Sequence, residues 1–297
     1  MYPDTHKIKL ILITGFLGSG KTTFLNHILK KYASRAGVIV NDFGALPVDA
    51  ALIKNSGVEN SRIYELNNGS IFCTCLTGAL GLALKFFTGC KPEFLFVEAS
   101  GLGDPSSIKK ILLDFQLLDY FSVQIICLAD PDKILKLQGI LPAVKRQITC
   151  ASQVIINKTD LYIEHIIKQA EEFIAEINPE ARCLRSEYGR VELQFTPARL
   201  PDENLNSCNS ETSRPGMMII KPENTDINEL EKLLFKILPY CLRIKGFFSG
   251  FYFSDSGGKI IKIRTEDDKP QGIQLIFNPA DGIIIKKTLA DNKIHEE

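Results

Sequence analysis

A glycine-rich segment near the N-terminus has the residue types and spacing that hold nucleotide phosphates. Residues 15–22 match the pattern G-x-x-x-x-G-K-[ST]. Glycines let backbone N–H groups turn inward around phosphate oxygens, and a following helix N-terminus adds partial positive charge. Lys21 is expected to reach the β- and γ-phosphates, and the Thr22 hydroxyl to bind Mg²⁺. The alternative, a chance glycine-rich turn, is disfavoured because an apolar run precedes the segment and an amphipathic one follows. The predicted phosphate site comprises Gly15, Gly18, Ser19, Gly20, Lys21, Thr22 and Thr23.

A second segment has the chemistry to read a guanine base. Residues 157–160 read Asn-Lys-Thr-Asp and follow the apolar run 153–156. The Asp160 carboxylate can accept hydrogen bonds from guanine N1–H and from the 2-amino group, a donor pair that adenine does not offer. We therefore predict that Asp160 selects the base and that Asn157 and Lys158 complete the base-binding loop. An N-cap at Asp160 is the alternative, and the same loop can serve both roles.

Two acidic residues stand at the ends of predicted strands. Asp42 follows the second strand, and Glu98 ends the third. A carboxylate at each position can hold a Mg²⁺-bound water or orient an attacking water, as phosphoryl transfer requires. Taken singly, each residue is more often part of a turn or a cap. Together with the two loops they favour a catalytic reading, in which Lys21, Asp42 and Glu98 are the catalytic residues.

The elements that must position these residues alternate along the first two thirds of the chain. Near-continuous apolar runs predict strands covered on both faces, and amphipathic segments between them predict helices. The predicted strands are Lys9–Thr14, Gly37–Asn41, Phe94–Glu98, Val123–Ala129 and Gln153–Asn157. The predicted helices are Lys21–Tyr32, Thr77–Phe87, Pro105–Phe115, Pro131–Leu137 and Tyr162–Ile177. This alternation predicts an α/β fold, with a mainly parallel sheet flanked by helices and ligands at the carboxyl ends of the strands.

The remainder of the chain has a different pattern. Residues 200–216 are polar and rich in Asn, Ser and Pro, which predicts a linker between residues 1–199 and 217–297. A helix is predicted from Asp226, with Glu229 completing a capping box and Pro239 ending the helix. Strands are predicted at Met217–Lys221, Arg243–Phe248, Gly250–Phe253, Lys259–Arg264, Ile273–Phe277 and Ile283–Lys286. Consecutive strands with one helix predict a smaller α+β domain.

The composition narrows the classes of function. The 297 residues carry 35 basic and 35 acidic side chains, a zero net charge that argues against a nucleic-acid platform. No apolar stretch reaches eighteen residues, so no membrane span is expected. The N-terminus lacks the features of a signal peptide. We therefore expect a cytoplasmic protein, whose eight cysteines are free thiols or ligands rather than disulfides.

Four stretches together resemble the CobW-like family of metal-associated P-loop GTPases, relatives of UreG and HypB. They are Gly15–Thr23, Val40–Ile53, Val97–Pro105 and Asn157–Leu161, with weaker support from Ile177–Ala181 and Arg243–Phe247. The resemblance implies a P-loop GTPase domain over residues 1–199 and a CobW-like C-terminal domain over 217–297. It also implies GTP binding and hydrolysis coupled to metal delivery, and a nucleotide-dependent homodimer.

This chain has fewer cysteines than the usual motif of that family. Its usual C-x-C-C follows an Asn-Gly pair, whereas this chain keeps Cys73 and Cys75 after Asn68-Gly69 and has no histidine-rich stretch. Residues two apart lie on one face of an extended segment, and thiolates favour Zn²⁺ or Cu(I). Two thiols do not complete a closed zinc site, so further ligands would come from a partner, a second copy, Asp42 or Asp49. Packing is the alternative, and the other six cysteines are interpreted as packing or surface residues.

These observations predict a slow GTPase that acts as a metallochaperone. It would bind GTP and Mg²⁺, and it would deliver a metal, Zn²⁺ being favoured, to a client metalloprotein. The missing third cysteine favours the alternative of a GTPase that remodels or reactivates a metalloenzyme or corrinoid protein without carrying metal. A regulator or scaffold with negligible turnover is a third reading. The sequence leaves open the metal, the client and the residue that positions the attacking water.

Overall fold

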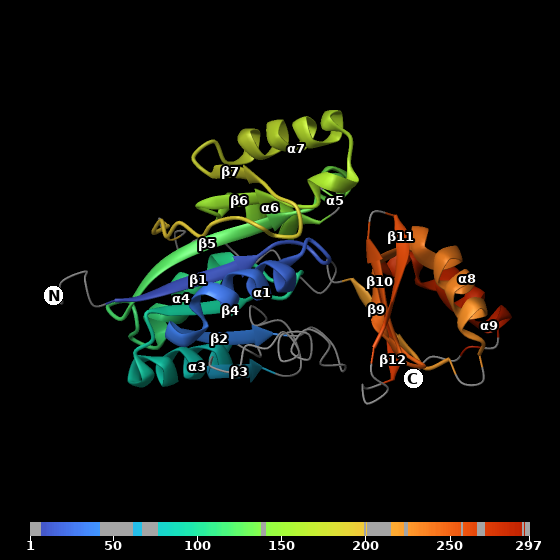
Figure 1. Ribbon diagram of the computed structural model, residues 1–297, viewed down its shortest axis with the longest axis horizontal. Helices are drawn as coiled ribbons and strands as arrows, with labels where there is room; N and C mark the ends of the chain where they lie inside the picture. Colours follow the sequence, from blue (N-terminus) through green and yellow to red (C-terminus); the bar gives the residue numbers. More distant parts are fainter. Residues whose placement is uncertain are drawn as a thin grey trace. The chain divides into compact units, whose positions relative to one another are not determined.

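The computed structural model divides into two compact units, drawn in Figure 1. The structure describes residues 7–41, 62–66, 77–137, 141–198, 200, 215–222, 225–256, 258–265, 271–292 and 294. The described residues up to Leu200 belong to the first unit, and those from Pro215 onward to the second. The predicted linker limits stay a prediction, since residues 201–214 lie outside the described part. None of the helices in that part is long and apolar enough to cross a membrane.

The first unit is built on a seven-stranded sheet with the order β3-β2-β4-β1-β5-β6-β7. Neighbouring strands are parallel throughout. The strands are β1 Ile8–Thr14, β2 Ala36–Asn41, β3 Arg62–Leu66, β4 Phe94–Glu98, β5 Phe121–Ala129, β6 Gln153–Ile156 and β7 Arg182–Arg185. Consecutive β1 residues from Leu10 to Ile13 are fully buried, so both faces of the sheet are covered there. The predicted parallel α/β sheet is confirmed.

Helices follow most strands of this sheet, and each strand's carboxyl end points to the same edge (Figure 1). The helices are α1 Lys21–Tyr32, α3 Thr77–Cys90, α4 Ile108–Asp114, α5 Pro131–Leu137, α6 Pro142–Thr149 and α7 Glu164–Ile177, and the short 3₁₀ turns are η2 Ala33–Arg35, η3 Pro105–Ser107 and η4 Thr159–Leu161. The predicted helix Pro105–Phe115 is thus two elements, η3 and α4. α7 begins two residues later than predicted.

Three elements of the first unit were not predicted. β7 has mostly exposed side chains, so it lacks the apolar run by which the other strands were found. β3 is a five-residue edge strand that pairs only with β2 in the described part of the sheet. α6 begins at Pro142 and spans eight residues, too few for a helical period to stand out.

The second unit is a five-stranded sheet with the order β11-β10-β9-β12-β8, antiparallel at each pair. Its strands are β8 Gly216–Ile220, β9 Cys241–Phe248, β10 Phe251–Ser256, β11 Lys259–Arg264 and β12 Gly272–Phe277, its helices are α8 Ile227–Ile237 and α9 Gly282–Asp291, and its 3₁₀ turns are η6 Leu238–Tyr240 and η7 Pro279–Asp281. Asp226 caps α8 by accepting hydrogen bonds from the N–H groups of Asn228 and Glu229 at 2.8 and 3.4 Å, which confirms the predicted cap.

The predicted strand Ile283–Lys286 is wrong, because these residues lie in α9. A run of three isoleucines has high β-propensity, but its burial follows a helical period: Gly282, Ile285 and Leu289 are buried. Ile283 and Ile284 are instead 79% and 43% exposed. Packing of the helix against the sheet therefore overrides the local preference of the run.

Candidate nucleotide-binding site

The glycine-rich loop joins β1, in the middle of the sheet, to α1. Gly15, Gly18 and Gly20 have φ angles of 133°, 74° and 100°, in the region that favours glycine. A Cβ at Gly15 would lie 2.1 Å from the carbonyl oxygen of Leu128, and one at Gly20 would lie 2.2 Å from Nδ2 of Asn157. No side chain caps α1, whose N-cap is Gly20, so its first-turn N–H groups are available to an anion.

Lys21 is buried and reaches back over this loop. Its Nζ donates hydrogen bonds to the carbonyl oxygens of Gly15 and Phe16, at 3.0 and 3.2 Å. The Ser19 hydroxyl is buried without a hydrogen-bond partner in the described part of the chain. The loop therefore gathers an ammonium, a buried hydroxyl and a helix N-terminus, which are groups that suit phosphate oxygens.

Thr22 and Glu98 come together although 76 residues separate them. The Thr22 Oγ1 donates a hydrogen bond of 2.7 Å to Oε1 of Glu98. Glu98 ends β4, the parallel neighbour of β1, and is only 2% exposed. A hydroxyl and a carboxylate are oxygen ligands of the kind that Mg²⁺ takes in nucleotide sites. Asp42, Cys73 and Cys75 lie outside the described residues, so their predicted roles stay predictions.

The segment after β4 is held by a residue that the sequence analysis missed. Gln147 of α6 donates hydrogen bonds from Nε2 to the carbonyl oxygens of Gly101 and Gly103, at 3.2 and 3.0 Å. A Cβ at Gly101 would lie 2.6 Å from the backbone nitrogen of Leu17, so this segment runs directly against the phosphate loop. Only recognition of α6 would have drawn attention to Gln147.

Asn157 ties the predicted base loop to the phosphate loop. Its Nδ2 donates to the carbonyl oxygen of Ser19, and its Oδ1 accepts from the N–H of Gly189, both at 2.9 Å. The residues of the loop 186–189 follow β7 and were also missed. The Ser186 carbonyl oxygen accepts hydrogen bonds from the N–H and the hydroxyl of Thr159, both at 3.2 Å. Three loops from distant parts of the sequence thus meet around one amide.

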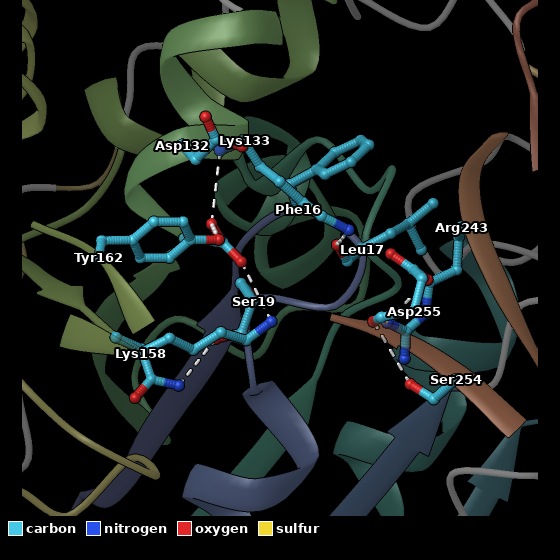
Figure 2. A network of polar contacts seen from close by, with 12 residues as sticks. Phe16, Leu17, Ser19, Asp132, Lys133, Lys158, Tyr162, Arg243, Ser254 and Asp255 are labelled. Atoms are coloured by element: carbon cyan, nitrogen blue, oxygen red, sulfur yellow. Dashed lines mark hydrogen bonds and ion pairs between the residues drawn. The ribbon is translucent and has the colours of Figure 1, made fainter. Parts of the chain in front are cut away.

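The remaining base-loop residues differ in environment. Asp160 is exposed and lies in η4. Lys158 adopts a left-handed conformation with φ of 64°, and its Nζ lies 3.0 Å from Oδ2 of Asp130. Asp130 follows β5 and also accepts a hydrogen bond of 2.9 Å from the hydroxyl of Tyr162. Lys158 and Tyr162 thus contact the same carboxylate, beside Ser19 of the phosphate loop (Figure 2). Neither Asp130 nor Tyr162 was predicted.

The described cysteines fit the interpretation as packing or surface residues. Cys127 and Cys150 are buried, Cys90 and Cys241 are partly buried, and Cys183 is exposed. Burial raises the pKa of Cys127 to about 12, so its thiol stays protonated at neutral pH. The described residues include no group of three or more His, Cys, Asp or Glu side chains that could hold a metal ion.

Comparison with known proteins finds similarity over the part of the chain that contains both loops. A family model described as the CobW/HypB/UreG nucleotide-binding domain matches residues 9–185. The chain is 29% identical over 225 residues to the zinc-regulated GTPase metalloprotein activator 1 of Dictyostelium discoideum, covering 63% of this chain and 47% of that protein. It is 28% identical over 215 residues to the zinc chaperone YeiR of Escherichia coli, covering 71% and 64%.

The solved structures to which this chain is similar include that of the zinc-bound YjiA GTPase of Escherichia coli. The alignment covers 96% of this chain and 98% of that chain, with a TM-score of 0.49 and 21% identity. This chain spans about half to two thirds of the length of the two curated relatives.

Proposed function

The chain belongs to the CobW/HypB/UreG family of nucleotide-binding domains, and from this membership we propose that it is a GTPase that serves metal delivery. It binds and slowly hydrolyses GTP, and its nucleotide state controls the binding and release of a metal ion, with Zn²⁺ favoured, to a client metalloprotein. The proposal of nucleotide binding rests on one observation: the side-chain amide of Asn157 joins the phosphate loop to the N-K-x-D loop. One molecule binding to both loops would be a guanine nucleotide.

The phosphate half of the proposed site acts through charge and oxygen ligands. Lys21 leaves the carbonyl oxygens of Gly15 and Phe16 and neutralises the β- and γ-phosphates, while backbone N–H groups of Gly18 to Thr23 surround them. Thr22 and Glu98 have the oxygen donors to hold Mg²⁺, directly or through water, and the ion would offset charge on the transferred phosphoryl group. Asp42 is proposed as the second carboxylate of this centre.

The base half selects guanine. Asp160 accepts two hydrogen bonds from the base, and its exposure in η4 leaves the carboxylate accessible to a nucleotide. Asn157 and Lys158 keep this loop against the phosphate loop. Intrinsic hydrolysis is expected to be slow, as in GTPases that await a group from a partner or from a second copy.

The metal part of the proposal rests on the names of the relatives and on Cys73 and Cys75. The two curated relatives are a zinc-regulated metalloprotein activator and a zinc chaperone. The cysteine pair binds the ion, and a nucleotide-dependent homodimer or the client supplies the missing ligands. A reducing cytoplasm would keep both residues as thiols. Neither nucleic acid nor membrane is expected as a partner, since the chain has zero net charge.

The decisive experiment is titration of Zn²⁺ into the purified chain with GDP and with a non-hydrolysable GTP analogue. We expect tighter Zn²⁺ binding in one nucleotide state and its loss in a Cys73→Ser, Cys75→Ser double variant. Cys90→Ser is the matched control, because Cys90 is a partly buried cysteine outside the motif. Equal affinity in both states, or none in either, would overturn metal delivery.

The second candidate is a GTPase that remodels or reactivates a metalloprotein client without carrying metal. The specific observation in its favour is that this chain keeps two cysteines where the family motif has three. In that case the double cysteine variant keeps wild-type GTP hydrolysis and wild-type stimulation of hydrolysis by a metal-free client. No difference in Zn²⁺ affinity between the double variant and the wild type would support this candidate over metal delivery.

A further inference from the structure

Asp130 is a buried carboxylate to which neither the proposed chemistry nor the family motifs assign a role. It is 1% exposed and directly follows β5, while Asn157 directly follows the neighbouring strand β6. The N–H of Asn157 donates a hydrogen bond of 2.8 Å to the carbonyl oxygen of Ala129, so the two loops start side by side. Burying a carboxylate is costly unless the group is paired, so its partners indicate what it is for.

Those partners lie symmetrically about the residue that is proposed to read guanine. Lys158 is two positions before Asp160, and its Nζ lies 3.0 Å from Oδ2 of Asp130. Tyr162 is two positions after Asp160, and its hydroxyl donates a 2.9 Å hydrogen bond to Oδ1 of Asp130. One buried carboxylate therefore holds both ends of the short turn η4, which carries Asp160 at its centre.

The backbone of this turn needs such support. Lys158 has a φ of 64° and a ψ of 32°, a left-handed conformation that side chains other than glycine adopt only at a cost in free energy. Its side chain is mostly buried, at 14% exposure, so the ion pair is poorly screened by water. The pair with Asp130 thus stabilises a backbone conformation that the local sequence by itself disfavours.

The same carboxylate also contacts the first turn of α5. The N–H of Lys133 donates to Asp130 Oδ1 at 3.4 Å, and the Lys133 Nζ lies 3.5 Å from the carbonyl oxygen of Leu17 in the phosphate loop. Asp130 therefore has a contact at the start of α5 besides those to the base loop, and Lys133 of the same helix contacts the phosphate loop. The phosphate contacts proposed for Lys21 and Thr22 involve other partners.

We propose that Asp130 is a positioning residue for base selection: through Lys158 and Tyr162 it fixes the turn that presents Asp160 to the guanine. This inference rests on the proposed guanine-nucleotide function and deepens it. Its consequence is specific, since loss of the Asp130 charge should weaken the contacts to the base and spare those to the phosphates.

The test compares GDP with inosine diphosphate, which lacks the 2-amino group that Asp160 accepts from. In the Asp130→Asn variant the GDP affinity should fall about tenfold, corresponding to one weakened hydrogen bond to a charged group, while the affinity for inosine diphosphate, which has only the N1–H contact to lose, falls by a smaller factor. The wild-type preference for GDP over inosine diphosphate should therefore become smaller. Tyr162→Phe should move the preference in the same direction by a smaller factor.

Asp132→Asn is the matched control, because Asp132 lies two residues away and its carboxylate pairs with Lys136 on the exposed side of α5. It should bind both nucleotides as the wild type does. An Asp130→Asn variant that loses affinity for both nucleotides by the same factor, or for neither, would overturn the inference. If Asp130→Asn fails to fold, an unchanged nucleotide preference in Tyr162→Phe overturns it equally. Failure of the wild type to bind GDP would instead contradict the proposed function.

Discussion

Asn157 has a role that its place in an N-K-x-D pattern only partly reveals. The pattern suggests contact with the base, whereas the structure also places the amide between Ser19 of the phosphate loop and Gly189 of the loop after β7. The space for this amide exists because residue 20 is a glycine, whose Cβ would otherwise lie 2.2 Å from Nδ2. Two residues 137 positions apart (157 − 20) therefore depend on each other.

Replacement of Asp160 by Asn should reverse part of the base recognition. The Asn carbonyl oxygen can still accept from guanine N1–H, but the new NH₂ group faces the 2-amino group, itself a donor, so we expect GDP affinity to fall by roughly 100-fold. Xanthosine diphosphate, which presents a carbonyl oxygen at the 2-position, should bind better to the variant than to the wild type. Competition against a fluorescent nucleotide measures both affinities, and unchanged GDP binding would contradict the assignment of Asp160.

The buried thiol of Cys127 should resist alkylation in the native chain. Burial raises its pKa to about 12, so at pH 8 almost no thiolate is present, and the thiolate is the reactive form. We expect iodoacetamide at pH 8 to modify Cys90, which is partly exposed, well before Cys127, and denaturant to remove the difference. Peptide mass mapping follows both sites, and equal native rates would contradict the packing role of Cys127.

At the scale of elements, the second unit depends on a close approach of two strands. Gly246 lies in β9, where it faces β12 across an antiparallel pair. A Cβ at this position would lie 2.0 Å from the carbonyl oxygen of Gly272 and 2.7 Å from the Cα of Ile273. Both obstacles are backbone atoms of the neighbouring strand, so no side chain can move aside to make room.

Gly246→Ala should therefore destabilise the second unit by about 2 kcal/mol or more, since the strands must separate to admit the methyl group. Gly258→Asn is the matched control: Gly258 also lies in the second unit, has open space around its Cβ position and has a φ of 72°, which Asn tolerates. Urea unfolding followed by circular dichroism measures both changes, and equal effects would contradict the steric argument.

At the scale of the molecule, the two units differ in architecture and in what they contribute. The described nucleotide-site residues all lie in the first unit, at the carboxyl ends of parallel strands. The second unit has its own apolar core, which α8 and α9 form with the antiparallel sheet. Each unit thus has the separate core that an independently folding domain requires.

A chain of residues 1–199 should bind GDP within about threefold of the affinity of the full chain, because each described contact of the site lies inside that range. Isothermal titration of the two proteins side by side provides the comparison. The full chain carrying Lys21→Ala should lose most of its nucleotide affinity. It therefore provides the reference for non-specific nucleotide binding in the titration. A fragment that folds but no longer binds GDP would show that the proposed domain limits are wrong.

The sequence by itself determined the class of fold and predicted the residues of the candidate site, because both depend on local patterns. Continuous apolar runs mark strands that are buried on both faces, and the glycines and lysine of residues 15–22 mark a loop whose conformation few other residues allow. The helix cap at Asp226 was also predictable from the sequence, because a cap depends on residues within one helical turn. Glu98 was predicted to serve phosphoryl transfer because it ends a strand, and the structure places its carboxylate 2.7 Å from the Thr22 hydroxyl.

Only the tertiary structure decided the features that depend on distant partners. The exposed strand β7 carries no apolar signal, yet it positions the loop at Ser186 against the base loop. The isoleucines of α9 resemble a strand until the sheet that buries Ile285 is known. Gln147 and Asp130 show no motif, because their roles arise from what they contact: two carbonyl oxygens in one case, and the two ends of the turn around Asp160 in the other.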